Sequence, residues 1–306
     1  MAESKIKTIS WEDGQNRITF APHHGRLLQV EIEGHNAIWE NDNYQGDWNP
    51  GGDRLWIAPE NDFFWKIKGP FDFEHYQIPP SLSENDWNIQ EETHSLTLSK
   101  ELNLENLHTK KTFKAKASRH YSKTEAHQDM DWLAVSAFTT KDTLVIEQNP
   151  AIHQKIGIWS LLQLPAGGTL SIPIQEENDH YQNYFNPIPE DLWNIENKQL
   201  KLKITGAHHY KVGVAKLSEG KLFYTREIDQ NRKLVIIRSF DLCPKENYCD
   251  KPLITDRELG DIAQVYNDGG EHGGFGELEI HSGSIDFASG SNTCEFITKT
   301  SIGIIR

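Results

Sequence analysis

The stretch that decides the fold is Leu-Thr-Leu-Ser-Lys-Glu-Leu-Asn-Leu at residues 96–104. Its leucines stand at positions 96, 98, 102 and 104, all of the same parity. Because successive side chains of a β-strand point to opposite faces, this spacing places the four leucines on one face. Residues 200–204 repeat the pattern, with lysines between Leu200, Leu202 and Ile204. Both stretches are therefore predicted to be half-buried β-strands.

Further segments rich in β-branched and aromatic residues follow one another along the chain, separated by clusters of glycine, proline, asparagine and aspartate. The segments that we predict as additional strands are 16–20, 26–33, 133–139, 143–148, 156–164, 168–174, 210–216, 221–228, 233–240, 277–281 and 293–298. Many short strands without alternating long helices indicate an all-β fold, a large antiparallel β-sandwich with few short helices.

Two segments are predicted to lie outside this pattern. Residues 255–266 have helical spacing of apolar residues, and Thr255 with Glu258 has the spacing of a capping box, so one short helix is expected there. Residues 119–131 are polar and are expected to form an exposed excursion.

The chain has 306 residues, and no change of composition marks a linker between domains. Large β-sandwiches reach about 200–250 residues as one unit, so this length does not require two domains. No repeat of fixed period is visible, which argues against a β-propeller. We therefore expect a single β-sandwich domain over residues 1–306.

The N-terminal residues and the cysteines indicate the compartment. Residues 1–7 contain no apolar stretch followed by a small-residue cleavage site, so we expect a cytoplasmic protein. The three cysteines do not suggest a disulfide framework, although Cys243 and Cys249 could bridge under oxidation. No apolar run approaches the roughly 18 residues of a membrane-spanning helix, so no membrane partner is expected.

The charge balance limits the class of partner. Against 31 lysines and arginines stand 45 aspartates and glutamates, a formal net charge of −14. This charge argues against nucleic acid or an anionic membrane surface as the main partner. Nothing in the sequence determines the oligomeric state.

The first segment with concentrated chemistry is 44–65, where two consecutive glycines, Gly51 and Gly52, stand among large aromatic residues, carboxylates and an arginine. Sugars need this mixture, because their apolar faces stack on rings while their hydroxyls take directional hydrogen bonds. The alternative is that the aromatics are core residues and that the arginine pairs with a buried carboxylate. The candidate ligand-binding residues are Trp48, Asp53, Arg54, Trp56 and Glu60.

A second such segment is 266–281, in which five glycines lead into a predicted strand. Alternation places Glu277, Glu279 and His281 on one face of that strand. A face with two carboxylates and an imidazole is either solvated or part of a site.

Metal and cofactor motifs are not visible. The sequence has no His-Glu-x-x-His or Cys-x-x-Cys motif, and the histidine pairs 23–24 and 208–209 are neighbours that point to opposite faces of a strand. Loop 40–47 is rich in aspartate and asparagine but lacks EF-hand spacing. There is no Gly-x-Ser-x-Gly nucleophile motif and no nucleotide-binding glycine motif at the start of a helix. We therefore predict no metal and no cofactor.

Residues 51–60 read Gly-Gly-Asp-Arg-Leu-Trp-Ile-Ala-Pro-Glu. They resemble the Gly-Gly-x-Arg-x-Trp-x-x-Pro-Glu signature of uncharacterised bacterial proteins in the galactose mutarotase-like superfamily. Residues 159–173 and the pair of stretches 266–269 and 276–279 are similar to the same relatives, in the same order. The resemblance implies a supersandwich with a carbohydrate cleft on the concave face of one sheet. It adds Trp159, Asn267 and Asp268 to the candidate ligand-binding residues.

Within that superfamily, aldose 1-epimerases open and close a sugar ring with a glutamate that removes the proton from the anomeric hydroxyl and a histidine that protonates the ring oxygen. The resemblance makes Arg54 the arginine that contacts the sugar. The sequence departs at both catalytic places: residues 156–161 contain no histidine, with His153 just before them, and residues 289–292 read Ser-Gly-Ser-Asn instead of supplying a Gly-Glu.

The candidate catalytic residues are therefore Glu277 and Glu279, with His153 or His281 as the partner and Glu60 as a further acid or base. Three functions stay open: an epimerase, lyase or hydrolase that acts on a small carbohydrate, a carbohydrate-binding module without turnover, and an enzyme that acts on a non-sugar small molecule. The carbohydrate functions require Arg54 to meet the carboxylates of 277 and 279 around one ligand.

Overall fold

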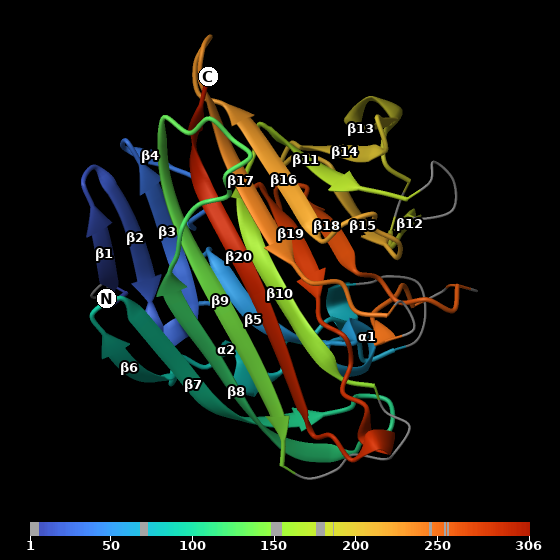
Figure 1. Cartoon of the computed structure of the whole chain (residues 1–306). Helices are drawn as coiled ribbons and strands as arrows, with labels where there is room; N and C mark the ends of the chain where they lie inside the picture. Colours follow the sequence, from blue (N-terminus) through green and yellow to red (C-terminus); the bar gives the residue numbers. More distant parts are fainter. Residues whose placement is uncertain are drawn as a thin grey trace.

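The computed structural model describes residues 6–67, 73–147, 155–175, 181–185, 187–244, 247–253, 255 and 257–306. In these ranges the chain forms two ten-stranded antiparallel sheets that lie face to face (Figure 1). The prediction of an all-β antiparallel sandwich is confirmed.

The first sheet has the strand order β1-β2-β3-β5-β10-β19-β18-β15-β12, with β4 beside β3. Its strands are β1 (Ile9–Asp13), β2 (Asn16–Ala21), β3 (Arg26–Ile32), β4 (His35–Asn36), β5 (Asp53–Ala58), β10 (Gly157–Pro165), β12 (Tyr181–Asn183), β15 (His209–Val214), β18 (Ala263–Asp268) and β19 (Phe275–His281). Strands from the beginning, the middle and the end of the chain are thus neighbours at its centre.

The second sheet has the order β13-β14-β11-β16-β17-β20-β9-β8-β7-β6. Its strands are β6 (Asn88–Glu92), β7 (Ser95–Glu105), β8 (Thr112–Lys123), β9 (Ala134–Ile146), β11 (Gly168–Pro173), β13 (Trp193–Glu196), β14 (Gln199–Ile204), β16 (Lys221–Glu227), β17 (Lys233–Phe240) and β20 (Thr293–Ile305). Short helical turns connect the strands: α1 (Glu60–Phe63), α2 (Pro80–Ser83), η1 (Pro22–His24), η2 (Phe73–His75), η3 (Glu190–Leu192) and η5 (Phe287–Ser289).

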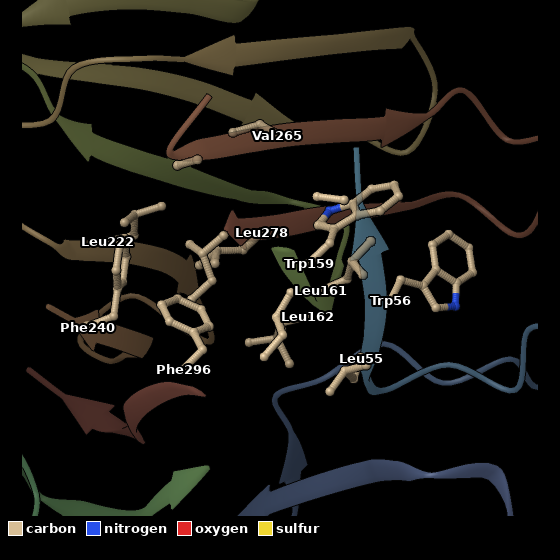
Figure 2. Packing of buried hydrophobic residues seen from close by; sticks show 14 of the residues in the cluster. Leu55, Trp56, Trp159, Leu161, Leu162, Leu222, Phe240, Val265, Leu278 and Phe296 are labelled. Carbon is tan, nitrogen blue, oxygen red and sulfur yellow. The ribbon is translucent and has the colours of Figure 1, made fainter. Parts of the chain in front are cut away.

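The core lies between the sheets. The alternating leucines of β7 and the apolar residues of β14 are buried, as their spacing predicts. Figure 2 shows Leu162 and Leu278 of the first sheet pointing toward Leu222 and Phe296 of the second. Because both sheets contribute to one hydrophobic cluster, we propose that residues 1–306 form a single domain.

The helix expected over 255–266 is wrong. Residues 263–268 form β18, and the described residues from 255 to 262 are not helical. Ala263 and Val265 alternate into the core, and β18 pairs with β15 on one side and β19 on the other. Hydrogen bonding to two neighbouring strands therefore decides the structure of an apolar run whose spacing alone is ambiguous.

The exposed excursion expected over 119–131 is also wrong in its first part. Residues 119–123 complete β8, and Arg119 is fully buried between the sheets.

Among the described residues, no helix is long and apolar enough to cross a membrane. Cys243, Cys249 and Cys294 are free thiols.

Candidate functional site

A cavity of about 180 Å³ lies on the face of the first sheet that points away from the second. Sites for drug-sized molecules typically measure roughly 300–1,000 Å³, so this cavity has room for one small ligand. Eight aromatic residues contribute to its walls. They are Trp48, Trp56, Phe73, Tyr76, Trp159, Phe185, Tyr266 and Phe275.

Strand register explains why side chains far apart in sequence meet there. Trp56 of β5 lies opposite Trp159 of β10, and Trp159 lies opposite His281 of β19. Two residues further along β10, Arg54 and Glu279 lie on either side of Leu161. Because alternate residues share a face, every second residue of β5, β10, β19, β18 and β15, five neighbouring strands, can point into the cavity.

Arg54 forms one side of the polar floor. Its Nη2 lies 2.7 Å from Glu277 Oε1, and Gln163 Nε2 donates to the same oxygen at 2.9 Å. The guanidinium carbon lies 4.1 Å from the ring centroid of Trp56 and 5.5 Å from that of Trp48. Arg54 Nε and Nη1 are buried and have no hydrogen-bond partner among the described residues. Arg54 therefore has donors left for a ligand.

Lys211 forms the other side. Its Nζ lies 2.9 Å from Glu60 Oε2 and 3.1 Å from Glu279 Oε2, and it lies 4.5 Å from the ring centroid of Trp159. Trp159 Nε1 donates to the same Glu279 oxygen at 2.9 Å. Glu279 Oε1 is buried without a hydrogen-bond partner among the described residues.

The pKa values of the side chains around Lys211 are shifted because several charged groups lie close together in a buried environment. Burial raises the pKa of Glu279 to about 8; Lys211 opposes this shift, and the nearby carboxylates of Glu277 and Glu60 add to it. Burial also raises the pKa of Glu60. Burial alone would lower the pKa of Lys211, but Glu279, Glu60 and Asp250 together hold it above its ordinary value. Lys211 is therefore an ammonium ion, which is not a nucleophile.

A buried polar cluster continues beside the floor, on the same face of the sheet. Tyr184 Oη donates to Asp261 Oδ2 at 2.6 Å, and Gln264 Nε2 donates to Asp250 Oδ2 at 2.6 Å. His281 Nε2 lies 3.9 Å from the same Asp250 oxygen, and the ring of His281 stacks on Trp159. Burial, and then the charge of Lys211, hold the pKa of His281 well below its ordinary value. This histidine is neutral, and it does not line the cavity.

Three predicted ligand-binding residues, Asp53, Asn267 and Asp268, do not line the cavity. Their side chains form contacts within the protein. Asp53 points into the space between the sheets, where Oδ1 pairs with Arg119 at 2.5 Å and Oδ2 with Arg238 at 2.8 Å. Its neighbour Arg54 faces the cavity, so the one-residue alternation of β5 separates them. Asn267 lies on the same inner face of its own strand.

Asn267 and Asp268 organise loops. Asn267 Oδ1 accepts hydrogen bonds from the backbone N–H groups of residues 205 and 206, both at 3.0 Å. Asp268 Oδ2 accepts from the N–H groups of Gly270, His272 and Gly274. The loop that Asp268 holds carries His272 to the edge of the cavity.

The other predicted residues fall into two groups. Trp48, Arg54, Trp56, Glu60, Trp159, Glu277 and Glu279 line the cavity together. His153 lies outside the described residues. Among the described residues, no group of three or more histidine, cysteine, aspartate or glutamate side chains could hold a metal ion.

Sequence reasoning missed Lys211, His272 and several of the aromatic residues. A signal for Lys211 was present: it stands between Tyr210 and Val212 in a predicted strand, where a lone lysine among apolar residues needs a buried partner. Nothing local marks Phe73, Tyr76 or Phe185, which reach the cavity from connections between strands.

One protein family model, described as "Family of unknown function (DUF6786)", matches residues 34–300. The chain belongs to this family. No curated protein sequence matches it.

Solved structures show what the fold is similar to. A putative aldose 1-epimerase from Escherichia coli K12 superposes with a TM-score of 0.56 at 10% identity, over 98% of this chain and 99% of that one. Galactose 1-epimerase from Lactobacillus acidophilus NCFM gives a TM-score of 0.45 at 9% identity, over 97% and 94% of the two chains. The first likeness shows a galactose mutarotase-like β-sandwich fold, as the sequence resemblance implied. The second is too loose to carry an argument.

Proposed function

We propose that the cavity binds one carbohydrate ring and that the chain is an acid–base enzyme, an isomerase that acts at the anomeric carbon. The observation that carries the proposal is the meeting of Arg54, Glu277, Glu279 and Lys211 on one floor beneath aromatic walls. Aromatic faces suit the C–H faces of a sugar. The unpartnered donors of Arg54 and the unpartnered Oε1 of Glu279 suit hydroxyl groups, which donate and accept.

Two carboxyl groups with different surroundings supply the chemistry. Glu279, whose pKa is raised to about 8, holds a proton near neutral pH and is the acid for the ring oxygen. Glu277 accepts two hydrogen bonds from Arg54 and Gln163, and it is the base for the anomeric hydroxyl. The two residues are two positions apart on β19, roughly 7 Å along the strand, so one sugar carbon above them is within reach of both.

The proposed step is balanced within the sugar and the two side chains. Glu277 takes the proton of the anomeric hydroxyl group, the bond from the anomeric carbon to the ring oxygen breaks, and Glu279 gives its proton to that oxygen. The open-chain aldehyde turns and the reverse steps close the ring on its other face. The putative aldose 1-epimerase named above, which shares the fold, supports this choice of reaction among those that two carboxyl groups allow.

The test is exchange between α- and β-anomers of a panel of aldoses, measured by NMR saturation transfer. We expect exchange at least tenfold faster than the spontaneous rate for one or more sugars, and return to the spontaneous rate in Glu279→Gln. Glu91→Gln, a substitution on the exposed strand β6, is the matched control and leaves the rate unchanged. No acceleration with any aldose would overturn the proposed reaction.

One observation favours a second function, carbohydrate binding without turnover. Both floor carboxyl groups are already engaged by cations, and β10 has no histidine where aldose 1-epimerases supply one. In that case calorimetry would show sugar binding that survives Glu277→Gln and Glu279→Gln, with no accelerated exchange by the unsubstituted protein.

A further inference from the structure

The side of the floor that Lys211 forms holds more acid than base. Three carboxyl groups act on the single ammonium: Glu60 and Glu279 by direct contact and Asp250 electrostatically. All four residues are at least 95% buried. If every carboxyl group were ionised, this buried group would carry a net charge of two negative units. Isolated buried charge is costly, so the group retains a proton near neutral pH.

The hydrogen bonds favour Glu279 over Asp250 as the carboxyl group that holds the proton. Asp250 Oδ1 accepts the backbone N–H of Glu60 at 2.5 Å, and Asp250 Oδ2 accepts from Gln264 at 2.6 Å. Both oxygens of Asp250 thus receive donors, which favours its charged form. Glu279 Oε1 has no donor among the described residues and belongs to a side chain of the cavity floor.

Asp250 also sets the position of Glu60. The N–H that it accepts is that of the first residue of α1, and the side chain of that residue reaches Lys211. Asp250 itself lies 190 positions further along the chain and does not line the cavity. It therefore acts on the ligand only through Glu60, Lys211 and Glu279.

We propose that Asp250 is a positioning residue of the site: it fixes Glu60 against Lys211, and its buried charge keeps the proton of the cluster on Glu279, facing the ligand. For its consequence in catalysis this inference rests on the proposed function. Raised pKa values of Asp250 and Glu279, with burial as the first cause, agree with a cluster short of positive charge.

The titratable and charged groups that face Asp250 and Glu279 come from several elements. They are Lys211 on β15, Glu60 on α1, Glu277 and His281 on β19, and Tyr76, Tyr184, Cys249 and Asp261 on the connections around them.

The experiment titrates Glu279 directly in the protein without sugar, by ¹³C NMR of labelled glutamate carboxyl groups. The signal is assigned as the one lost in Glu279→Gln. In Asp250→Asn, the side-chain oxygen still accepts the Glu60 N–H but the charge is gone. Removing a nearby negative charge makes ionisation of Glu279 easier, so we expect its midpoint to fall by about one pH unit.

A second variant covers the case in which Asp250→Asn does not fold. Gln264→Met removes the donor to Asp250 Oδ2, so Asp250 competes for the proton and the Glu279 midpoint falls in the same direction by a smaller amount. The matched control is Asp142→Asn, an equally buried aspartate that pairs with Arg119 between the sheets, where we expect no change.

An unchanged Glu279 midpoint in the folded Asp250 or Gln264 variant overturns the inference, as does an equal shift in the Asp142 control. The outcome is independent of the proposed function, because no sugar is present. If the unsubstituted protein does accelerate anomer exchange, the alkaline limb of its pH–rate profile moves to lower pH in Asp250→Asn.

Discussion

Lys211 holds two carboxyl groups in place, at 2.9 Å from Glu60 and 3.1 Å from Glu279, and its side chain is 4% exposed. Removing one partner from a buried ion pair leaves the other charge without compensation, which typically costs about 3–5 kcal/mol. At the scale of single residues, the floor of the cavity therefore depends on a lysine that sequence reasoning did not select.

The substitution Lys211→Met tests this dependence. We expect the free energy of unfolding to fall by about 3 kcal/mol at pH 7 and by less at pH 5, because the carboxyl groups left behind can take up protons. Urea unfolding followed by tryptophan fluorescence measures both values. Lys141→Met is the control, since Lys141 pairs with Glu295 on the surface, and such pairs contribute about 0–1 kcal/mol. Equal losses of unfolding free energy in the two variants would contradict the inference that the buried carboxyl groups of the floor depend on Lys211.

At the scale of elements, the sequence predicted the strands whose two faces differ. Strands β7 and β14 are buried on one face only, so their apolar residues alternate and their positions could be read directly. Strand β5 is buried along all six residues, with Asp53 facing the second sheet and Arg54 facing the cavity. No alternation marks such a strand, and it was recognised only as a segment rich in chemistry.

The same limit applies to the candidate site. Alternation correctly placed Glu277 and Glu279 on one face of a strand, but His281, on that face too, lies beneath Trp159 instead of at the cavity. Asn267 and Asp268 belonged to a glycine-rich segment that the sequence marked as important, yet they hold loops. Which face of a strand meets the ligand depends on the register with its neighbours, and that register is set by residues about a hundred or more positions away.

At the scale of the whole molecule, buried carboxyl groups make stability depend on pH. Burial raises the pKa of Glu279 to about 8 in the folded chain, from an ordinary value of 4.5. The folded state therefore binds more protons than the unfolded state between these values, and stability falls as pH rises through that window. Raised pKa values of Glu60, Asp250 and Asp261 act in the same direction.

We therefore expect the unfolding midpoint in urea to decrease between pH 5 and pH 8 more steeply in the unsubstituted protein than in Glu279→Gln, whose side chain cannot ionise. Circular dichroism at a series of pH values measures the difference between the two slopes. Parallel slopes would show that Glu279 ionises in the folded chain as easily as in the unfolded chain.

The central claim is that the aromatic walls and the floor around Arg54 and Lys211 form one site for a sugar ring. Saturation-transfer difference NMR with a panel of monosaccharides tests it most directly. We expect transfer to the ring C–H protons of at least one sugar, loss of that transfer in Trp159→Ala, and retention in Trp193→Ala, since Trp193 is a tryptophan of the second sheet. Absence of transfer to every monosaccharide, or equal transfer in the Trp159 variant, would contradict it.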